Sequence, residues 1–166
     1  LSDKGEFYTN PTLYRSIFMN FAKHADIFIA AHYYGVGSPF LFTREDAKHP
    51  EFNLKVIADI SCDINGPVAS TIRSSTITSP IYGYNPEIEE EDDYMKNDVV
   101  AVMAVDNLPC ELPKDASEDF GNELLDTIIP FIVIGDKENT LENATICKDG
   151  DLTSRFEYLR DFVNRS

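Results

Sequence analysis

The sequence predicts an α/β fold built on a parallel β-sheet. Residues 55–60 form an almost unbroken apolar run with β-branched side chains, which is typical of a strand buried on both faces of a parallel sheet. A second apolar run of strand length lies at residues 26–31, and a helical connection separates the two runs. A third run of this kind lies at residues 98–105. Consecutive strands joined through a helix form a βαβ unit, which requires parallel pairing.

The first element predicted along the chain is a helix that begins at Asn10. Asn is a favourable N-cap residue, and Pro11 suits the first helical position. After the strand at residues 26–31 comes a loop rich in aromatic residues and glycine, and residues 43–46 then predict the cap of a short helix. The apolar face of the first helix, read from its helical spacing, is Leu13, Tyr14, Ile17, Phe18 and Phe21.

The middle of the chain is polar. Residues 71–78 are rich in Ser and Thr and carry Arg73 as their only charge, and residues 81–84 predict a short strand. Residues 87–93 hold six carboxylates. We expect this acidic run to be a solvated loop, because it lacks the alternation of oxygen ligands with a turn glycine that a calcium site needs.

The carboxyl-terminal part predicts two helices around a polar loop. The longer helix begins near Asp115, and Pro130 should kink it because proline lacks the backbone donor. A polar loop at residues 135–143 and a short segment at residues 144–147 lead to a last helix capped near Asp151. The predicted inward-facing residues are Ala116, Phe120, Leu124, Ile128 and Phe131 in the longer helix, and Leu152, Phe156, Leu159 and Val163 in the last one.

Length, composition and charge indicate a globular domain with a core of its own. The chain has 166 residues, of which 43% are hydrophobic. Its net charge is −15, and residues 86–166 carry most of the excess, with 21 acidic and 7 basic side chains. Such a surface repels nucleic acid and anionic lipid, so we exclude both as partners. The longest apolar run, residues 128–134, is far shorter than the roughly 20 residues of a membrane span.

Three widely spaced cysteines, Cys62, Cys110 and Cys147, form no C-x-x-C pair. This sparse, odd set is typical of the cytoplasm or another reducing intracellular compartment, and it argues against a disulfide scaffold or a zinc site. We therefore predict no metal site. The chain opens without Met, which indicates the cut edge of a longer polypeptide.

Polar side chains follow each of the three predicted strands. In a parallel sheet these strand ends lie along one edge, where the ligands of open α/β sheets bind. Carboxylates and amides at such an edge can bond a ribose, an amide or an amino acid. The side chains in question are His32 after the first strand, Ser61, Asp63 and Asn65 after the second, and Asp106 and Asn107 after the third.

Three of these signals have simpler interpretations. Asp63 and Asn65 equally favour an Asx-type turn before Gly66. His32 is more often a satisfied structural histidine or a wall residue than an acid or base. Cys62 lies beside the predicted site, but no positive charge near it in the sequence would activate a thiolate, so we interpret it as a packing residue. The sequence also contains no glycine-rich dinucleotide or phosphate loop, no Gly-x-Ser-x-Gly elbow and no His-Glu-x-x-His motif.

The most specific pattern lies at residues 105–121, Val-Asp-Asn-Leu-Pro-Cys-Glu-Leu-Pro-Lys-Asp-Ala-Ser-Glu-Asp-Phe-Gly. It resembles the lysine–2-oxoglutarate reductase and saccharopine dehydrogenase family, within the wider alanine dehydrogenase and transhydrogenase superfamily. In that family an Asp-Asn-Leu-Pro or Asp-His-Leu-Pro element ends the nucleotide domain, and a Leu-Pro and an Ala-Ser/Thr-Glu-x-Phe helix start follow it. Further likenesses at residues 6–15, 33, 41–47, 57–63, 74–79 and 144–159 extend the resemblance over roughly the whole chain.

The resemblance implies a Rossmann-like domain that binds NAD or NADP. It also implies a reaction that interconverts an amino acid with a 2-oxo acid and an amine, by hydride transfer coupled to imine formation or hydrolysis. By position, Asp63 resembles the acidic residue that faces the nicotinamide and the substrate, and Asp106 and Asn107 resemble a pair that contacts cofactor and substrate. These three are the catalytic candidates. The cofactor-binding candidates are Ala31, His32, Ser61, Asp63, Asn107 and Leu108.

The family's glycine-rich phosphate loop, and the Lys and His that donate protons in its amino-terminal domain, have no counterpart in this chain. We expect them upstream of Leu1, so that the chain is the carboxyl-terminal part of a longer enzyme and is inactive alone. Residues 1–114 would then be the second half of the NAD(P)-binding domain, and residues 115–166 a return helix and closing strand–helix segment that reach a missing catalytic domain. The missing half would leave a sheet edge exposed, which favours homo-oligomers.

Two other functions stay open on the sequence alone. The enzyme could be an alanine dehydrogenase, since substrate selection depends largely on residues outside the chain. The missing phosphate loop is also compatible with a non-catalytic domain that keeps the scaffold for binding or assembly. The choice between NAD and NADP stays open too, because the acidic residue that reads the ribose 2′-hydroxyl would lie in the missing half.

Overall fold

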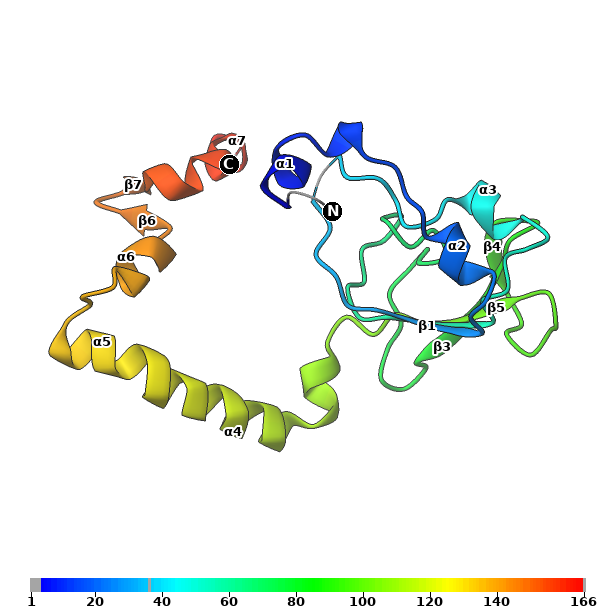
Figure 1. Cartoon of the computed structure of the whole chain (residues 1–166). Helices are drawn as coiled ribbons and strands as arrows, with labels where there is room; N and C mark the ends of the chain where they lie inside the picture. The colour runs from blue at the N-terminus through cyan, green and yellow to red at the C-terminus, as the bar shows by residue number, and fades with distance from the viewer. Residues whose placement is uncertain (1–3, 36, 166) are drawn as a thin grey trace. The chain divides into compact units, whose positions relative to one another are not determined.

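The computed structural model describes residues 4–35 and 37–165, and the chain separates into two compact units, Leu1–Glu111 and Leu112–Ser166 (Figure 1). The first unit contains a five-stranded sheet in the order β1-β2-β5-β3-β4. Its parallel strands are β1 (Ile27–Ala30), β2 (Val56–Asp59) and β5 (Val100–Met103), and the antiparallel hairpin is β3 (Ile81–Asn85) and β4 (Glu90–Asp92). The α/β class and the three parallel strands are as predicted. The sequence did not indicate the antiparallel direction of the hairpin.

One face of this sheet holds the core. The pairing register aligns Phe28, Ile57, Val102 and Tyr82 across four strands, and the last three are buried. Residues of the short helices α2 (Met19–Ala22) and α3 (Arg44–Ala47) belong to the same hydrophobic cluster. The cluster explains why short helices suffice here, because tertiary packing of an apolar face stabilises a helix more than propensity does.

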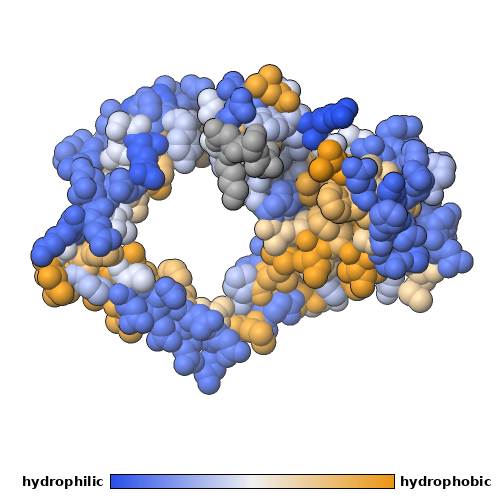
Figure 2. Space-filling view, in the orientation of Figure 1, coloured by the Kyte–Doolittle hydropathy of each residue, from blue (hydrophilic) through white to orange (hydrophobic). Residues whose placement is uncertain are grey.

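The opposite face of the sheet is open. Its strand residues alternate with those of the core face, and Ile27 and Ile29 of β1 are each 63% exposed. Val56 of β2 and Ile81 of β3 are also exposed. Figure 2 shows hydrophobic residues gathered on the surface of the first unit over the sheet. Parallel strands are normally covered on both faces, so this open face is unusual.

The prediction of one helix that begins at Asn10 is wrong. The structure instead has α1 (Lys4–Thr9), a 3₁₀ turn η1 (Pro11–Leu13) and, after an extended segment, α2. Asn10 precedes η1, but its side chain makes no capping hydrogen bond. Ser16 accounts for the break, because its hydroxyl donates to the carbonyl of Leu41 and accepts from the backbone N–H of Phe18, just before α2.

Two other predictions in the first unit have mixed outcomes. The predicted cap at residues 43–46 is confirmed, since Thr43 and Asp46 form a reciprocal capping box at the start of α3. The acidic run at residues 87–93 is only partly the expected loop, because Glu90–Asp92 forms strand β4. Its carboxylates are also paired: Glu89 with Lys48 and Glu91 with Arg73.

A long helix dominates the second unit. It consists of α4 (Pro113–Glu123), a π-helical segment η3 (Leu124–Ile128) and α5 (Ile129–Ile134). The N–H of Ile129 bonds the carbonyl of Leu124, five residues back. Pro130 follows immediately and has no N–H, so the widened turn accommodates the missing donor. The irregularity expected at Pro130 therefore takes the form of a π segment.

The rest of the second unit consists of short elements. Asp136 accepts hydrogen bonds from the backbone N–H groups of Thr140 and Leu141, which places α6 (Thr140–Ala144) inside the expected polar loop. A hairpin of β6 (Cys147–Lys148) and β7 (Asp151–Leu152) precedes η4 (Ser154–Leu159) and α7 (Arg160–Val163). The helix cap predicted near Asp151 is wrong, because Asp151 lies in β7 and forms an ion pair with Arg160.

The inward-facing stripes predicted for this unit have no core to cover. None of the described residues from 112 to 165 is fully buried, but seven of the nine predicted stripe residues are half-buried. These seven are Ala116, Leu124, Ile128, Phe131, Leu152, Phe156 and Leu159. The other two, Phe120 and Val163, are 66% and 45% exposed. The buried core of the described residues therefore lies entirely in the first unit, beside the sheet.

Candidate functional site

Three strand ends meet at one edge of the sheet in the first unit. β1 pairs in parallel with β2, and β2 with β5, so their carboxyl ends point the same way. Just past the strands, the backbone N–H of Ile60 donates to the carbonyl of Ala30 at 2.8 Å. The pairing of β1 with β2 thus continues to the last residue of β1. Ligand sites of open α/β sheets lie at such an edge.

Asp59, the last residue of β2, organises the segment after it. The residue is fully buried, and one carboxylate oxygen accepts hydrogen bonds from the N–H groups of Ser61 and Cys62, at 3.1 and 3.2 Å, and from the Ser61 hydroxyl at 2.6 Å. The other oxygen accepts from the Thr71 hydroxyl at 2.6 Å. The sequence-based interpretation missed Asp59. A carboxylate inside a buried apolar run was the available signal, because a buried carboxylate must be satisfied by donors.

Negative charges from two strand ends act on the thiol of Cys62. This residue has a left-handed backbone, with φ of 52°, and its thiol donates to the carbonyl of Asp59 at 3.0 Å. Burial raises the pKa of the thiol, and the negative charges of Asp59, Asp106 and Asp63 raise that pKa further. The thiol is therefore held protonated, which supports its interpretation as a packing residue. The same effect shows that Asp63 and Asp106 act on one small region.

Asp63 to Gly66 forms a tight turn that a backbone hydrogen bond closes, whereas the simpler interpretation of this segment expected an Asx-type turn closed by a side chain. The N–H of Gly66 donates to the carbonyl of Asp63 at 2.9 Å, and a Cβ atom on Gly66 would lie only 2.6 Å from the Asp63 Cβ. Asn65 has a φ of 53°, and its side chain accepts from Arg44 at 2.9 Å. Asn65 is thus a turn residue, whereas Asp63 keeps a half-buried carboxylate at the strand end.

A shallow groove of about 360 Å³ adjoins the end of β5. One wall is the Ser/Thr-rich segment at residues 75–78, and the other includes Val105, Asp106, Asn107 and Cys110. Ser75 joins the two walls: its N–H donates to the carbonyl of Ala104 at 2.8 Å, and its hydroxyl accepts from the Ala104 N–H at 3.0 Å. Asp106 and Asn107 are exposed along this groove.

The remaining candidates, Ala31, His32 and Leu108, follow the ends of β1 and β5 in the sequence. Ala31 is exposed directly after β1, and Leu108 is half-buried at the start of η2 (Leu108–Glu111). His32 is half-buried, and its Nε2 atom is buried without a hydrogen-bond partner. A buried polar nitrogen of this kind needs a water molecule or a ligand atom to satisfy it. A structural role for His32 would therefore need a water molecule at Nε2, because none of the described residues satisfies that atom.

A larger hollow of about 650 Å³ lies in the second unit, next to α6 and η4. It is lined by polar residues, among them Asp136, Asn143 and Arg155, and none of its lining residues is buried. Asn143 and Arg155 bond each other at 3.0 Å. An open hollow whose polar groups pair among themselves is a weaker site than the strand-end edge.

The sequence matches a known family over most of its length. A sequence model of the alanine dehydrogenase/PNT C-terminal domain covers residues 8–155. The chain belongs to the alanine dehydrogenase/PNT C-terminal domain family. This membership agrees with the resemblance carried by residues 105–121, and it places all the strand-end candidates inside the family domain.

Several curated relatives of this family member are much longer proteins. The chain is 32% identical over 164 residues to alpha-aminoadipic semialdehyde synthase of Arabidopsis thaliana, covering 95% of the chain and 15% of the plant protein. It is 26% identical over 185 residues to the mitochondrial alpha-aminoadipic semialdehyde synthase of Mus musculus, covering 95% of the chain and 20% of that protein. An NAD(+), L-lysine-forming saccharopine dehydrogenase of Schizosaccharomyces pombe is 28% identical over 109 residues, with 63% of the chain and 27% of that protein covered. The chain thus spans less than a third of each relative.

Two other features are absent from residues 4–35 and 37–165. No helix there is long and apolar enough to cross a membrane. No group of three or more His, Cys, Asp or Glu side chains in the same ranges could hold a metal ion.

Proposed function

We propose that this chain forms the nucleotide-binding half of the active site in an NAD(P)-dependent amino-acid oxidoreductase of the saccharopine dehydrogenase type. One observation carries the proposal: the carboxyl ends of β1, β2 and β5 meet at a single edge, where Asp63, Asp106 and Asn107 lie. The names of the relatives supply the reaction type. Because these relatives are several times longer, the activity belongs to a longer polypeptide that supplies the rest of the site.

The residues at this edge fit the nicotinamide and ribose end of the cofactor. The orphaned Nε2 of His32 and the amide of Asn107 supply hydrogen-bonding groups, and the hydroxyls of Thr76 and Thr78 suit a ribose. No basic side chain lines the groove at residues 75–78 and 105–110, so the cofactor phosphates would be held elsewhere in the longer polypeptide. When bound, the nicotinamide ring donates or accepts the hydride.

The electrostatics of the edge suit an amino-acid substrate. Asp63 and Asp106 both raise the pKa of the Cys62 thiol, so their negative charges act on the same space. Negative charges at close range favour a cationic amino group and disfavour an anion. Within the proposed site, Asp63 and Asp106 therefore orient the substrate amine, and Asn107 bonds both cofactor and substrate. Ser61 shapes the edge, because its hydroxyl is already bonded to Asp59.

The two units have separate roles in this proposal. Residues 1–114 form the second half of the NAD(P)-binding domain, and residues 115–166 return the chain to the catalytic domain. The division of the chain after Glu111 supports this assignment. So does the exposed apolar surface of α4 to α5, because a helix with its apolar side open lacks a partner.

Cofactor binding tests the proposed half-site. In the full-length protein, calorimetric titration with NADH and NADPH should give a dissociation constant that rises about tenfold for Asn107→Ala. Asn97→Ala is the matched control, because Asn97 is equally exposed but lies before β5, away from the groove. Equal affinities in both variants would contradict the half-site. For the 166-residue chain alone, a constant tighter than about 1 mM would mean that the edge binds without the missing half.

Substrate assays separate the proposed enzyme from its alternatives. Full-length protein should turn over lysine plus 2-oxoglutarate with a reduced nicotinamide cofactor. Turnover of pyruvate plus ammonia instead would identify an alanine dehydrogenase, which the family description keeps as the second candidate. A full-length protein that binds neither NADH nor NADPH and shows neither activity with added cofactor would contradict both and favour a binding or assembly domain.

A further inference from the structure

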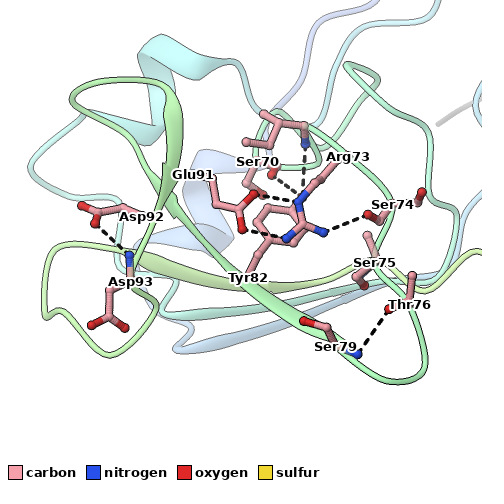
Figure 3. A network of polar contacts seen from close by, with 12 residues as sticks. Ser70, Arg73, Ser74, Ser75, Thr76, Ser79, Tyr82, Glu91, Asp92 and Asp93 are labelled. Carbon is pink, nitrogen blue, oxygen red and sulfur yellow. Dashed lines mark hydrogen bonds and ion pairs between the residues drawn. The ribbon is translucent and has the colours of Figure 1, made fainter.

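One side chain, Arg73, is held from three directions (Figure 3). Its Nε and one terminal nitrogen donate to the two carboxylate oxygens of Glu91, each at 2.7 Å. The other terminal nitrogen donates to the carbonyl of Ser74 at 3.0 Å. The guanidinium also lies 4.3 Å from the centre of the Tyr82 ring. Forked bonding and ring stacking both constrain the orientation of a guanidinium, which a single contact would not.

Tyr82 also binds the segment that contains Arg73, residues 70–73. Its hydroxyl donates to the carbonyl of Ser70 at 3.0 Å and accepts from the N–H of Ile72 at 3.2 Å. The residue is only 2% exposed, and burial raises the pKa of its phenol, so the hydroxyl stays a donor. The ring and the hydroxyl of one core residue thus bind three positions, 70, 72 and 73, to strand β3.

The segment held in this way connects two parts of the proposed site. At one end, the Thr71 hydroxyl donates to Asp59, which shapes the end of β2. At the other end, Ser75 bonds Ala104 twice and begins the wall of the groove that faces Asp106. Arg73 lies midway between these two attachments. A shift of its side chain would therefore move the groove wall relative to the strand ends.

We infer that Arg73 is a positioning residue of the proposed cofactor site. Clamped between Glu91 and Tyr82, it sets the path of residues 74–79, and so sets the width of the groove opposite Asp106 and Asn107. The inference rests on the function proposed above, but it concerns a residue that touches neither substrate nor cofactor. Arg73 and Glu91 are 40% and 50% exposed, so their ion pair alone adds little to global stability. Its effect belongs to the local geometry.

Two mild variants test the clamp without endangering the fold. Arg73→Lys keeps a cation near Tyr82 but cannot form the forked bond, and Glu91→Gln removes the charge at nearly constant shape. In the 166-residue chain, amide hydrogen exchange of residues 74–79 should become about fivefold faster in each variant. In the full-length protein, the Kd for NADH should rise about fivefold while kcat at saturating cofactor stays within about twofold.

The chain offers a matched control and a rescue. Arg160 makes the same forked bond with Glu157, at 2.8 and 2.9 Å, in the second unit. Glu157→Gln should change neither the exchange of residues 74–79 nor the Kd. The charge-swapped pair Arg73→Glu with Glu91→Arg should restore part of the protection that Arg73→Glu alone removes, because the two side chains are in direct contact.

The outcomes distinguish this inference from the proposed function. Unchanged exchange at residues 74–79 in both variants would overturn the clamp, whatever the cofactor data show. Faster exchange with an unchanged Kd, in a protein that binds NADH, would also overturn it, because the segment would then not shape the cofactor site. Wild-type protein that binds neither NADH nor NADPH would contradict the proposed function, while the exchange rates would still decide whether Arg73 holds the segment.

Discussion

At the scale of single residues, the edge of the sheet depends on Asp59. Its two carboxylate oxygens accept four hydrogen bonds, and two of these come from backbone N–H groups of the segment after β2. The fourth comes from Thr71, twelve residues along the chain. A buried carboxylate with this many donors directs the backbone as a helix cap does, because each N–H group it satisfies has no other partner in the turn.

We expect Asp59→Ala to destabilise the first unit by about 2–4 kcal/mol, because it leaves several buried donors without an acceptor. Asp59→Asn should cost less, since the amide oxygen still accepts and the Thr71 hydroxyl can accept from its NH₂ group. Chemical denaturation followed by circular dichroism measures both. Asp98→Ala, at an exposed position before β5, is the control and should cost under about 0.5 kcal/mol. Equal effects at positions 59 and 98 would refute the role of Asp59.

Asp63 and Asn107 are expected to matter for turnover rather than for folding. In the full-length protein, Asp63→Ala and Asn107→Ala should each lower kcat/KM by at least about tenfold, because both side chains would touch substrate or cofactor. Their unfolding transitions should stay close to wild type, since both side chains are at least partly exposed. Wild-type rates in both variants would show that the strand ends are not the active site.

At the scale of elements, carboxylates of the acidic run in and around the β3–β4 hairpin form ion pairs with Lys and Arg side chains. Lys48 lowers the pKa of Glu89, Arg73 lowers the pKa of Glu91, and Lys96 lowers the pKa of Asp92 to about 2. In each case the first cause is a hydrogen bond to the cation, which stabilises the charged carboxylate. The run that the sequence presented as a solvated loop is thus anchored at three carboxylates.

These lowered pKa values predict a sign for the pH dependence of stability. A carboxylate whose pKa is lower in the folded chain stabilises it above the unfolded value and loses that contribution as pH falls through the folded value. The unfolded values are 4.5 for Glu91 and 3.8 for Asp92, so stability should fall from about pH 4.5 down to about pH 2. Thermal melting across this range measures the loss.

Glu91→Gln should make the decline in melting temperature below pH 4.5 shallower, because one titrating carboxylate is removed. Glu87→Gln is the matched control, since Glu87 is an exposed member of the same acidic run. If both variants decline as steeply as wild type, the Arg73–Glu91 ion pair contributes nothing measurable to acid stability.

At the scale of the whole molecule, the open face of the sheet in the first unit exposes apolar side chains to solvent. Ile27 and Ile29 are each 63% exposed on β1, which is also an edge strand paired only with β2 among the described residues. Val56 and Ile81 continue the apolar surface over two further strands. An apolar sheet face and an unpaired edge both favour association with another chain.

We expect the 166-residue chain to self-associate through this face. Sedimentation velocity should show dimers or larger species, and added salt should strengthen them, because it screens the repulsion of a net charge of −15. Ile29→Lys should shift the population to monomers. Ile88→Lys, at a position 56% exposed in the β3–β4 turn, should not. Monomers at every salt concentration, or equal effects of the two substitutions, would contradict this expectation.

The sequence by itself determined the α/β class and the positions of the three parallel strands. Strands β1, β2 and β5 are short runs of β-branched and apolar residues. Because that pattern is local, it can be recognised without knowledge of the fold. The polar residues after each run were equally visible, as was the cap at Thr43. Parallel pairing then brought Asp63, Asp106 and Asn107 to one edge, because the carboxyl ends of parallel strands lie at the same edge of a sheet. Of these three strands, only β1 and β2 are joined through a helix; the hairpin β3–β4 lies between β2 and β5 in the sequence.

Only the tertiary structure decided which side chains fix the backbone around the candidate site. The helix expected after Asn10 breaks because Ser16 bonds Leu41, a partner 25 positions away. The hydrogen bonds of Asp59 and Arg73 depend likewise on distant partners. Asp59 bonds Thr71, 12 positions away, and Arg73 bonds Glu91, 18 positions away. Local patterns encode burial and turn preferences, but they carry no record of which distant residues meet. Those meetings are set by the path of the chain around the core, and in this protein they position the candidate site.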